Sequence, residues 1–288
     1  RGGKGMRGII VTSEFEGDEN SLIMFPGGIN PNKLRQYILY WDKIDYPSNN
    51  IMYKQLTPDE EYLVNAGVMQ RTDVRFWSDK PININPLVFI NAQIETFKNK
   101  SQNIGEVWNI AQPTRKIILP RKDSFVSRSI QVELLDCLPV PTSDVNLEDI
   151  LNFKEKRYHE LLELRALLDE MYTSIINSAD IGFEKNRCIE KVQNKIIEID
   201  RVMNESGIRR FFSNFKTELN VSSLLKSGLE IATGYTIGSH YGFPVLGAIT
   251  GLVTSSINIT ADVTMKPNFI PDDLKDYAYL LYARKELV

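Results

Sequence analysis

The residues that most often carry enzyme chemistry or bind zinc are scarce in this chain. It has two histidines, His159 and His240, and two cysteines, Cys137 and Cys188. A zinc site of the His2Cys2 type would need all four, from four distant places in the sequence, whereas structural zinc ligands usually come in closely spaced pairs. We therefore expect no metal and no other cofactor, and interpret the histidines as solvated or structural.

Motifs that mark catalysis or phosphate binding are also missing. No strand-linked G-x-G-x-x-G, Walker A, G-x-S-x-G, H-E-x-x-H or C-x-x-C occurs. Carboxylates are plentiful, but none forms a pair inside an apolar run, the setting that raises a carboxyl pKa for acid catalysis. We assign no catalytic residue and favour a non-enzymatic function.

One segment combines basic and aromatic residues. Its members are Arg209, Arg210, Phe211, Phe212, Phe215 and Lys216. Such a mixture can contact nucleic acid or a membrane surface, because cations bind phosphates while rings bind bases or lipid. Aromatic side chains at these spacings also dock connecting segments onto a core. Both interpretations stay open, and this segment is the predicted interaction site.

The overall charge disfavours nucleic acid as a partner. Lysine and arginine total 34 against 37 acidic residues, a net charge of −3, whereas phosphate binding calls for a basic surface. Residues 61–71 have the pattern of a helix, a glycine turn and a strand, as in a winged helix. Asp59, Glu60 and Glu61 give that helix the wrong charge for DNA.

The composition, 42% hydrophobic and 25% charged over 288 residues, is that of a folded protein of about two domains. We interpret residues 1–5, which precede Met6, as the remnant of an expression tag. An acidic stretch follows soon after Met6 and leaves no room for a secretory segment. The two cysteines fit reduced thiols. We therefore expect a cytoplasmic protein.

The first half of the chain predicts a mixed α/β domain, residues 6–140. Strands at 8–15 and 21–25 are expected to form a hairpin, covered by a helix that begins after the capping residue Asn30. The capping-box pattern at Thr57 predicts a second helix. Further expected elements are a strand at 68–76, a helix at 87–98, and strands near 106–111, 116–119 and 128–135.

The second half predicts a helical domain, residues 147–288, reached through a Pro-containing linker at 141–146. The prolines of Leu138–Pro141 are expected to prevent both helix and sheet pairing there. A helix of roughly thirty residues begins after Asn146, with Arg157 interrupting its apolar stripe, and a second helix ends at Gly207. The simplest arrangement is an antiparallel hairpin that packs like a coiled coil.

The stretch from Ile231 to Ala261 contains no Asp, Glu, Lys or Arg. Small residues recur four apart in its two arms, a spacing that permits close helix packing. They are Gly234, Gly238, Gly242, Gly247, Gly251 and Ser255. The arms 228–241 and 244–261 would reach only about 21 and 27 Å as helices, against roughly 30 Å of bilayer hydrocarbon. We therefore expect this apolar hairpin inside the helical domain rather than in a membrane.

Several segments resemble an uncharacterised bacterial family that is catalogued as a domain of unknown function. The likeness spans nearly the whole chain from Met6. It is carried by Tyr40–Asp45, by Leu138–Pro141 running into Leu147–Phe153, by the apolar hairpin and by the closing Tyr277–Leu287 helix. The resemblance implies a bacterial cytoplasmic protein. It supplies no activity and no catalytic residue, because the family is uncharacterised.

Three functional hypotheses follow. The first is a non-catalytic interaction protein that acts through a protein partner or self-association, in an antiviral-defence or toxin-related system. The second is a membrane-active effector that inserts the apolar hairpin 228–261. The third is a nucleic-acid-binding protein, which the charge disfavours.

Overall fold

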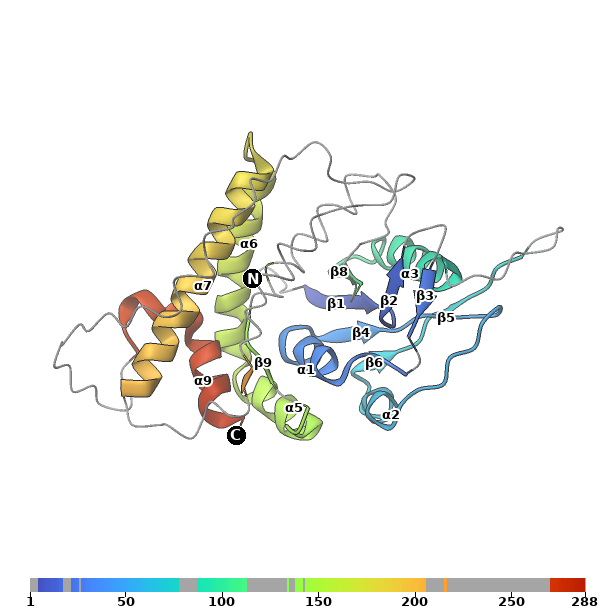
Figure 1. Ribbon diagram of the computed structural model, residues 1–288, viewed down its shortest axis with the longest axis horizontal. Coiled ribbons are helices and arrows are strands. Elements are labelled where there is room, and N and C mark those ends of the chain that lie inside the picture. Colours follow the sequence, from blue (N-terminus) through green and yellow to red (C-terminus); the bar gives the residue numbers. More distant parts are fainter. Residues whose placement is uncertain are drawn as a thin grey trace.

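The described part of the chain contains a parallel β-sheet followed by packed helices, as the computed structural model shows (Figure 1). The structure describes residues 5–17, 22–25, 27–77, 87–112, 134, 138–141, 143–205, 215–216 and 270–287. Helices and parallel strands occur together, so the predicted mixed α+β class is confirmed.

Four parallel strands form the sheet, in the order β6-β4-β1-β8. They are β1 (Met6–Val11), β4 (Lys43–Asp45), β6 (Met69–Gln70) and β8 (Glu106–Ala111). The chain moves outward from β1 through β4 to β6, and then returns to the other side of β1 as β8. The direction of winding therefore reverses at β1, which is the topological switch point where ligands bind in open α/β sheets.

Helices cover both faces of this sheet. The α1 helix (Pro31–Tyr40) packs on the face that buries Ile9, and α3 (Leu87–Lys100) packs on the face that buries Ile10. Successive residues of a strand point to opposite faces of the sheet, so Ile9 lies in the core under α1 and Ile10 lies in the core under α3. The core under α3 consists of Ile10, Phe15, Ile90, Ile94, Phe97, Trp108 and Ile110.

Two predicted helix starts are confirmed. The side chain of Asn30 accepts hydrogen bonds from two backbone N–H groups of the first turn of α1, at 3.0 and 3.4 Å. At α2 (Pro58–Asn65), Thr57 Oγ1 accepts from the N–H of Glu60, whose carboxylate accepts from the N–H of Thr57. These local contacts satisfy N–H groups that have no partner within the helix.

The predicted N-terminal hairpin is wrong in its first strand. The hairpin joins β2 (Phe15–Gly17) to β3 (Leu22–Met24), whereas most of the predicted strand 8–15 belongs to β1. Ile9, Ile10 and Val11 of β1 are fully buried, as expected for a central parallel strand covered by helices on both faces. The α1 helix accordingly packs on the parallel sheet and not on the hairpin.

The strand predicted at 68–76 is divided into β6 and β7 (Asp73–Val74), and β7 pairs with β5 (Ser48–Asn49). The division falls at Thr72, whose backbone N–H and hydroxyl both donate to the carboxylate of Asp45, at 3.1 and 2.6 Å. The N–H of Thr72 thus bonds to a side chain, while its carbonyl still accepts from the N–H of Ser48 at 2.9 Å.

The remaining predictions for the first half have different outcomes. The helix at 87–98 and the strand near 106–111 are confirmed as α3 and β8. The strand predicted at 116–119 lies outside the described residues. Of the strand predicted at 128–135, the structure describes only Leu134, which is helical.

The predicted thirty-residue helix is instead two helices, α5 (Leu147–Lys156) and α6 (Tyr158–Ile176). The break is at Arg157, whose guanidinium lies 3.7 Å from the ring centroid of Tyr282 and donates to Glu286 Oε1 at 2.9 Å. The α5 helix contacts α1, whereas α6 continues in another direction.

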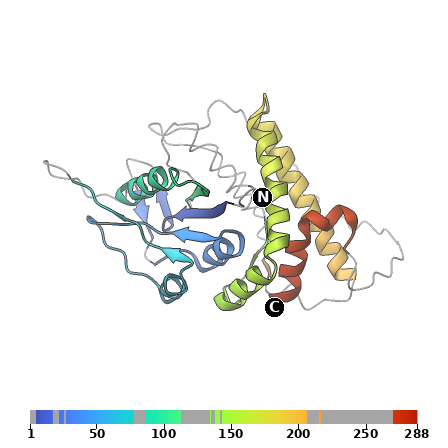
Figure 2. The ribbon, with the colours of Figure 1, turned by 180° about the vertical axis from the view of Figure 1, so that it is seen from behind.

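Beside α6 runs α7 (Ile181–Glu205), joined to it by a short loop, so the two form an antiparallel pair (Figure 2). The predicted end at Gly207 lies outside the described residues. The C-terminal helix begins after Pro271, first as a 3-10 helix η2 (Asp272–Tyr277) and then as α9 (Ala278–Glu286). Both η2 and α9 pack against α6.

The predicted linker takes part in sheet pairing, so the expectation that its prolines prevent pairing was wrong. The strand β9 (Val140–Pro141) pairs antiparallel with β10 (Phe215–Lys216). Proline is tolerated here because β9 belongs to a two-stranded ribbon, in which one edge of each strand needs no partner.

The sheet and the helices share one apolar core. A single cluster of buried residues contains Ile9 and Leu39 of the first half together with Leu164 and Leu281 of the second. The hydroxyl of Tyr279 donates to the carbonyl of Leu39 at 2.8 Å. The predicted domain boundaries stay a prediction. Within the described ranges, no helix has the length and apolar character required to cross a membrane.

Candidate functional site

Polar side chains converge at the carboxyl edge of the sheet. Ser13 follows β1, Tyr46 follows β4, and their hydroxyl oxygens lie 2.5 Å apart. Lys54, in the segment after β5, donates through Nζ to Ser13 Oγ and, at 3.5 Å, to the carbonyl of Phe25. We call Ser13, Tyr46, Lys54 and the neighbouring Glu60 the carboxyl-edge cluster.

Glu60 is fully buried and fixes the loop that leads into α1. Its Oε1 accepts from the backbone N–H of Ile29 at 2.7 Å, while its Oε2 accepts from the backbone N–H of Thr57 in the capping box of α2. A Cβ atom at Gly28 would lie 2.2 Å from Oε1, so this close approach needs glycine. The carboxylate thus holds two segments of the carboxyl edge together.

The environment of the cluster keeps the phenol of Tyr46 neutral. Burial, opposed by the hydrogen bond with Ser13, raises the pKa of Tyr46 to about 12, and the charge of Glu60 adds to this while Arg71 lowers it. Burial lowers the pKa of Lys54 below its ordinary value, against the opposing effect of Glu60. Tyr46 therefore stays a neutral phenol near pH 7.

Arg71, just after β6, holds the backbone around the cluster. Its Nη1 donates to the carbonyl of Lys54 at 2.9 Å and its Nε to the carbonyl of Tyr46 at 3.3 Å. Its guanidinium carbon also lies 5.4 Å from the centroid of the Tyr46 ring. These contacts position Lys54 before any ligand arrives.

On the other side of β1, side chains from the fold itself occupy the switch point. Gln93 of α3 donates through Nε2 to the carbonyls of Ile10 and Ala111, both at 2.8 Å. Its Oε1 accepts from Gln112 Nε2 at 2.9 Å. Because these amides already bind the diverging ends of β1 and β8, ligand binding is favoured on the β4 side, where Lys54 lies.

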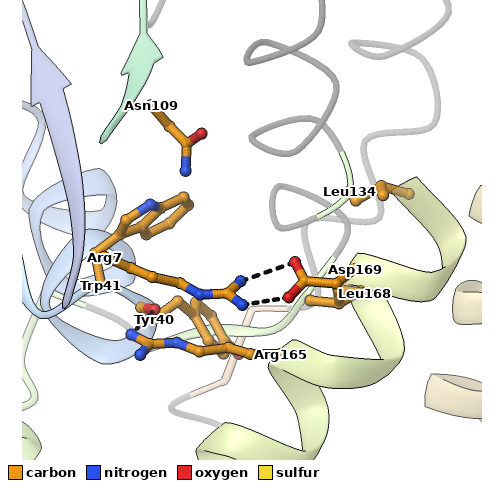
Figure 3. Close-up of a pocket in the computed structure, with 8 residues that line it drawn as sticks. All are labelled: Arg7, Tyr40, Trp41, Asn109, Leu134, Arg165, Leu168 and Asp169. Carbon is orange, nitrogen blue, oxygen red and sulfur yellow. Dashed lines mark hydrogen bonds and ion pairs between the residues drawn. The ribbon is translucent and has the colours of Figure 1, made fainter. Parts of the chain in front are cut away.

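A small cavity lies between the sheet and α6 (Figure 3). Its volume is about 10 Å³, so it has room for at most one water molecule. Arg7 reaches across it to both carboxylate oxygens of Asp169, and Arg165 lies along its wall. Its size and its ion pair indicate a structural junction rather than a binding site.

The sequence-based site predictions are largely outside the described residues. Arg209–Phe212 and the small residues of the apolar hairpin belong to that part of the chain, as do His240 and Cys137. For Phe215 and Lys216 the structure gives the backbone pairing in β10. His159 is exposed, as predicted, and Cys188 is a buried free thiol.

Across the described ranges, no group of three or more His, Cys, Asp or Glu residues is arranged to hold a metal ion. Sequence reasoning missed the carboxyl-edge cluster because Ser13, Tyr46 and Lys54 match no motif. A partial signal was present: Ser13 follows the buried apolar run Ile9–Val11, and polar residues after such strands gather at the carboxyl edge of a parallel sheet. The strand before Tyr46 has one apolar residue, Ile44, and gives no such signal.

The sheet, its polar carboxyl edge and the attached helices define a mixed α+β protein with a candidate ligand site at the carboxyl ends of β1 and β4. The family model described as "Family of unknown function (DUF6236)" matches residues 3–288, so the chain belongs to this family. This confirms the resemblance to an uncharacterised family. No curated protein and no solved structure matches the chain.

Proposed function

We propose that this protein is a non-catalytic binding protein whose carboxyl-edge cluster takes a small anionic ligand. The observation that carries the proposal is the position of Lys54, a half-buried cation that donates to Ser13 and whose backbone carbonyl accepts from Arg71, beside the switch point. An ammonium group has three N–H donors. Among the described residues, two of these donors contact Ser13 and the carbonyl of Phe25, and the proposal assigns the third to an anion.

The exposure of the hydroxyl groups supports binding over catalysis. Ser13 and Tyr46 are only 1% and 2% exposed, so neither presents a nucleophile to solvent. The pKa of Tyr46, near 12, is also far from the range in which a general base works at neutral pH. Glu60 is enclosed and already accepts two backbone N–H bonds, so it adds no exposed negative charge.

The proposal is tested by titrating phosphate at constant ionic strength. Saturating phosphate should raise the melting temperature, because a ligand at one hundred times its Kd stabilises by about 2.7 kcal/mol. The Lys54→Met variant should lose this response. The control Lys98→Met removes a surface lysine paired with Glu95 and should keep it. An equal response in wild type and Lys54→Met, or no response in either, contradicts the proposal.

A protein partner or self-association remains a second proposal, which rests on the tip of the α6–α7 pair. Ile176 and Phe183 are large apolar side chains that are exposed near this tip. Exposed apolar side chains that lie close together are typical of contact surfaces. Replacing Phe183 with Asp should weaken self-association in analytical ultracentrifugation without lowering stability. If the wild type sediments as a monomer at all concentrations, self-association through this tip is wrong.

The membrane-active hypothesis stays a proposal without structural support, because the apolar hairpin 228–261 lies outside the described residues. Liposome leakage by the wild type, compared with the Gly238→Asp variant, would test it.

A further inference from the structure

Two exposed aromatic side chains adjoin Lys54 at the carboxyl edge. Phe25, directly after β3, is 41% exposed, and Tyr53 is 85% exposed. Phe25 adjoins the ammonium group because its carbonyl accepts from Lys54 Nζ, and Tyr53 precedes Lys54 in the chain. Scattered exposed rings are ordinary, but here the backbone of one exposed aromatic residue contacts the Lys54 ammonium group, and a second exposed aromatic residue directly precedes Lys54.

The backbone of both segments is held in place although the rings are exposed. The N–H of Phe25 donates to the carbonyl of Glu14 at 3.0 Å. The carbonyl of Lys54 accepts from Arg71 Nη1 at 2.9 Å. A ring on a fixed backbone loses little conformational freedom when a second ring stacks on it, which favours binding.

We infer that the ligand of the carboxyl-edge cluster is a nucleotide: its phosphate binds Lys54 and its base stacks on Phe25 or Tyr53. This inference rests on the proposed function and adds to it that the anionic ligand also carries a flat aromatic base. The charge pattern agrees, since the cation lies at the cluster and the apolar rings lie beside it. Ile23, two residues before Phe25 on β3, is also exposed and extends the apolar side of the site.

Five probes separate the contributions of charge and ring: inorganic phosphate, ribose 5-phosphate, adenosine, and the nucleotides AMP and CMP. Binding is measured by calorimetry at constant ionic strength. Stacking of one base on an aromatic ring contributes enough to change affinity by roughly 5- to 150-fold. We expect at least one nucleotide to bind more tightly than ribose 5-phosphate by a factor in that range, and adenosine to bind weakly.

Variants assign the effect to residues. The double variant Phe25→Ala/Tyr53→Ala should bind the nucleotide no more tightly than ribose 5-phosphate, while its affinity for ribose 5-phosphate stays that of the wild type. Tyr158→Ala, which removes an exposed ring on α6, is the matched control and should change neither affinity. Lys54→Met should weaken every phosphate-bearing probe.

The outcomes distinguish the two proposals. If nucleotides and ribose 5-phosphate bind equally and both depend on Lys54, the inference about the ring is overturned and the anion site stands. A nucleotide preference that persists in the double alanine variant also overturns it. If no phosphate-bearing probe binds, the proposed function itself fails, and the inference fails with it.

Discussion

Arg165 on α6 and Asp42, directly before β4, form a two-pronged ion pair between the helices and the sheet. Arg165 Nη1 lies 3.1 Å from Asp42 Oδ2, and Nη2 lies 3.0 Å from Oδ1. Nη2 also donates to the carbonyl of Tyr40 at 2.7 Å, and Asp42 Oδ2 accepts from the N–H of Arg7. One carboxylate therefore joins the start of β1, the start of β4 and α6.

Removing the negative charge of Asp42 should strongly destabilise the protein. In Asp42→Asn the buried guanidinium of Arg165 loses its compensating charge, and breaking such a pair costs about 3–5 kcal/mol. Urea denaturation followed by circular dichroism measures the change. Arg75→Gln, which breaks the exposed pair with Asp73, should cost less than about 1 kcal/mol. If Asp42→Asn and Arg75→Gln lower the free energy of unfolding by the same small amount, the Arg165–Asp42 pair contributes little to stability.

Lys154 should make stability rise in mildly alkaline solution. Burial, opposed by Asp42 and assisted by Arg165 and Lys43, lowers the pKa of Lys154 to about 8. The unfolded chain, in which a lysine has its ordinary pKa near 10.5, then binds more protons between these two values, so stability rises with pH there. By pH 10 the free energy of unfolding should have risen by about 2 to 3 kcal/mol from this group.

Comparison with Lys154→Met isolates this effect. The variant has no group to titrate at that position, so its free energy of unfolding between pH 7.5 and 10 should lack the rise seen in the wild type. Burial raises the pKa values of Tyr40 and Tyr279 in both proteins, so their contribution cancels in the difference. Parallel curves for the two proteins would contradict the low pKa of Lys154.

Gly8 on β1 should not tolerate a methyl group. A Cβ atom there would lie 2.3 Å from the indole ring of Trp108 on β8, which is buried under α3. Gly8→Ala should therefore cost roughly 1–3 kcal/mol through overpacking. In a Trp108→Phe background the same substitution should cost less, because the smaller ring leaves space. Additive costs in this double-mutant cycle would exclude the clash as the cause.

Glu286 should hold α9 against the break between α5 and α6. Burial opposes ionisation of this carboxyl, but hydrogen bonds from Lys156 and Arg157 lower the pKa of Glu286 overall. In Glu286→Gln, hydrogen exchange of residues 278–286 should accelerate at pH 7, while exchange in α3 stays unchanged. The difference between the two proteins should shrink below the ordinary glutamate pKa and vanish only below the lowered pKa of Glu286, where the wild-type carboxyl is also neutral in the folded protein.

Features determined by neighbouring residues were predictable from the sequence. The helix starts at Asn30 and Thr57 depend on hydrogen bonds within three residues, so the sequence pattern contains the whole cause. The end of α5 is different. Arg157 ends the helix beside Glu286, which lies 129 residues away in sequence, and no local pattern contains that partner.

The candidate site was missed for the same physical reason. Ser13, Tyr46 and Lys54 have no common motif and meet only because β1 and β4 are parallel neighbours in the sheet. An apolar strand such as β1 pairs equally well in a hairpin or in a parallel sheet until helices cover both of its faces. The topology therefore had to be known before the site could be recognised.

The hydrogen bond from Tyr279 to Leu39 has a consequence during protein synthesis. The two residues are separated by 240 positions, so at roughly 5–20 residues per second the ribosome adds Tyr279 on the order of 10 to 50 s after Leu39. During that interval α1 lacks the helix that covers its final turn. Until Tyr279 is added, this apolar surface of the nascent chain lacks its native cover.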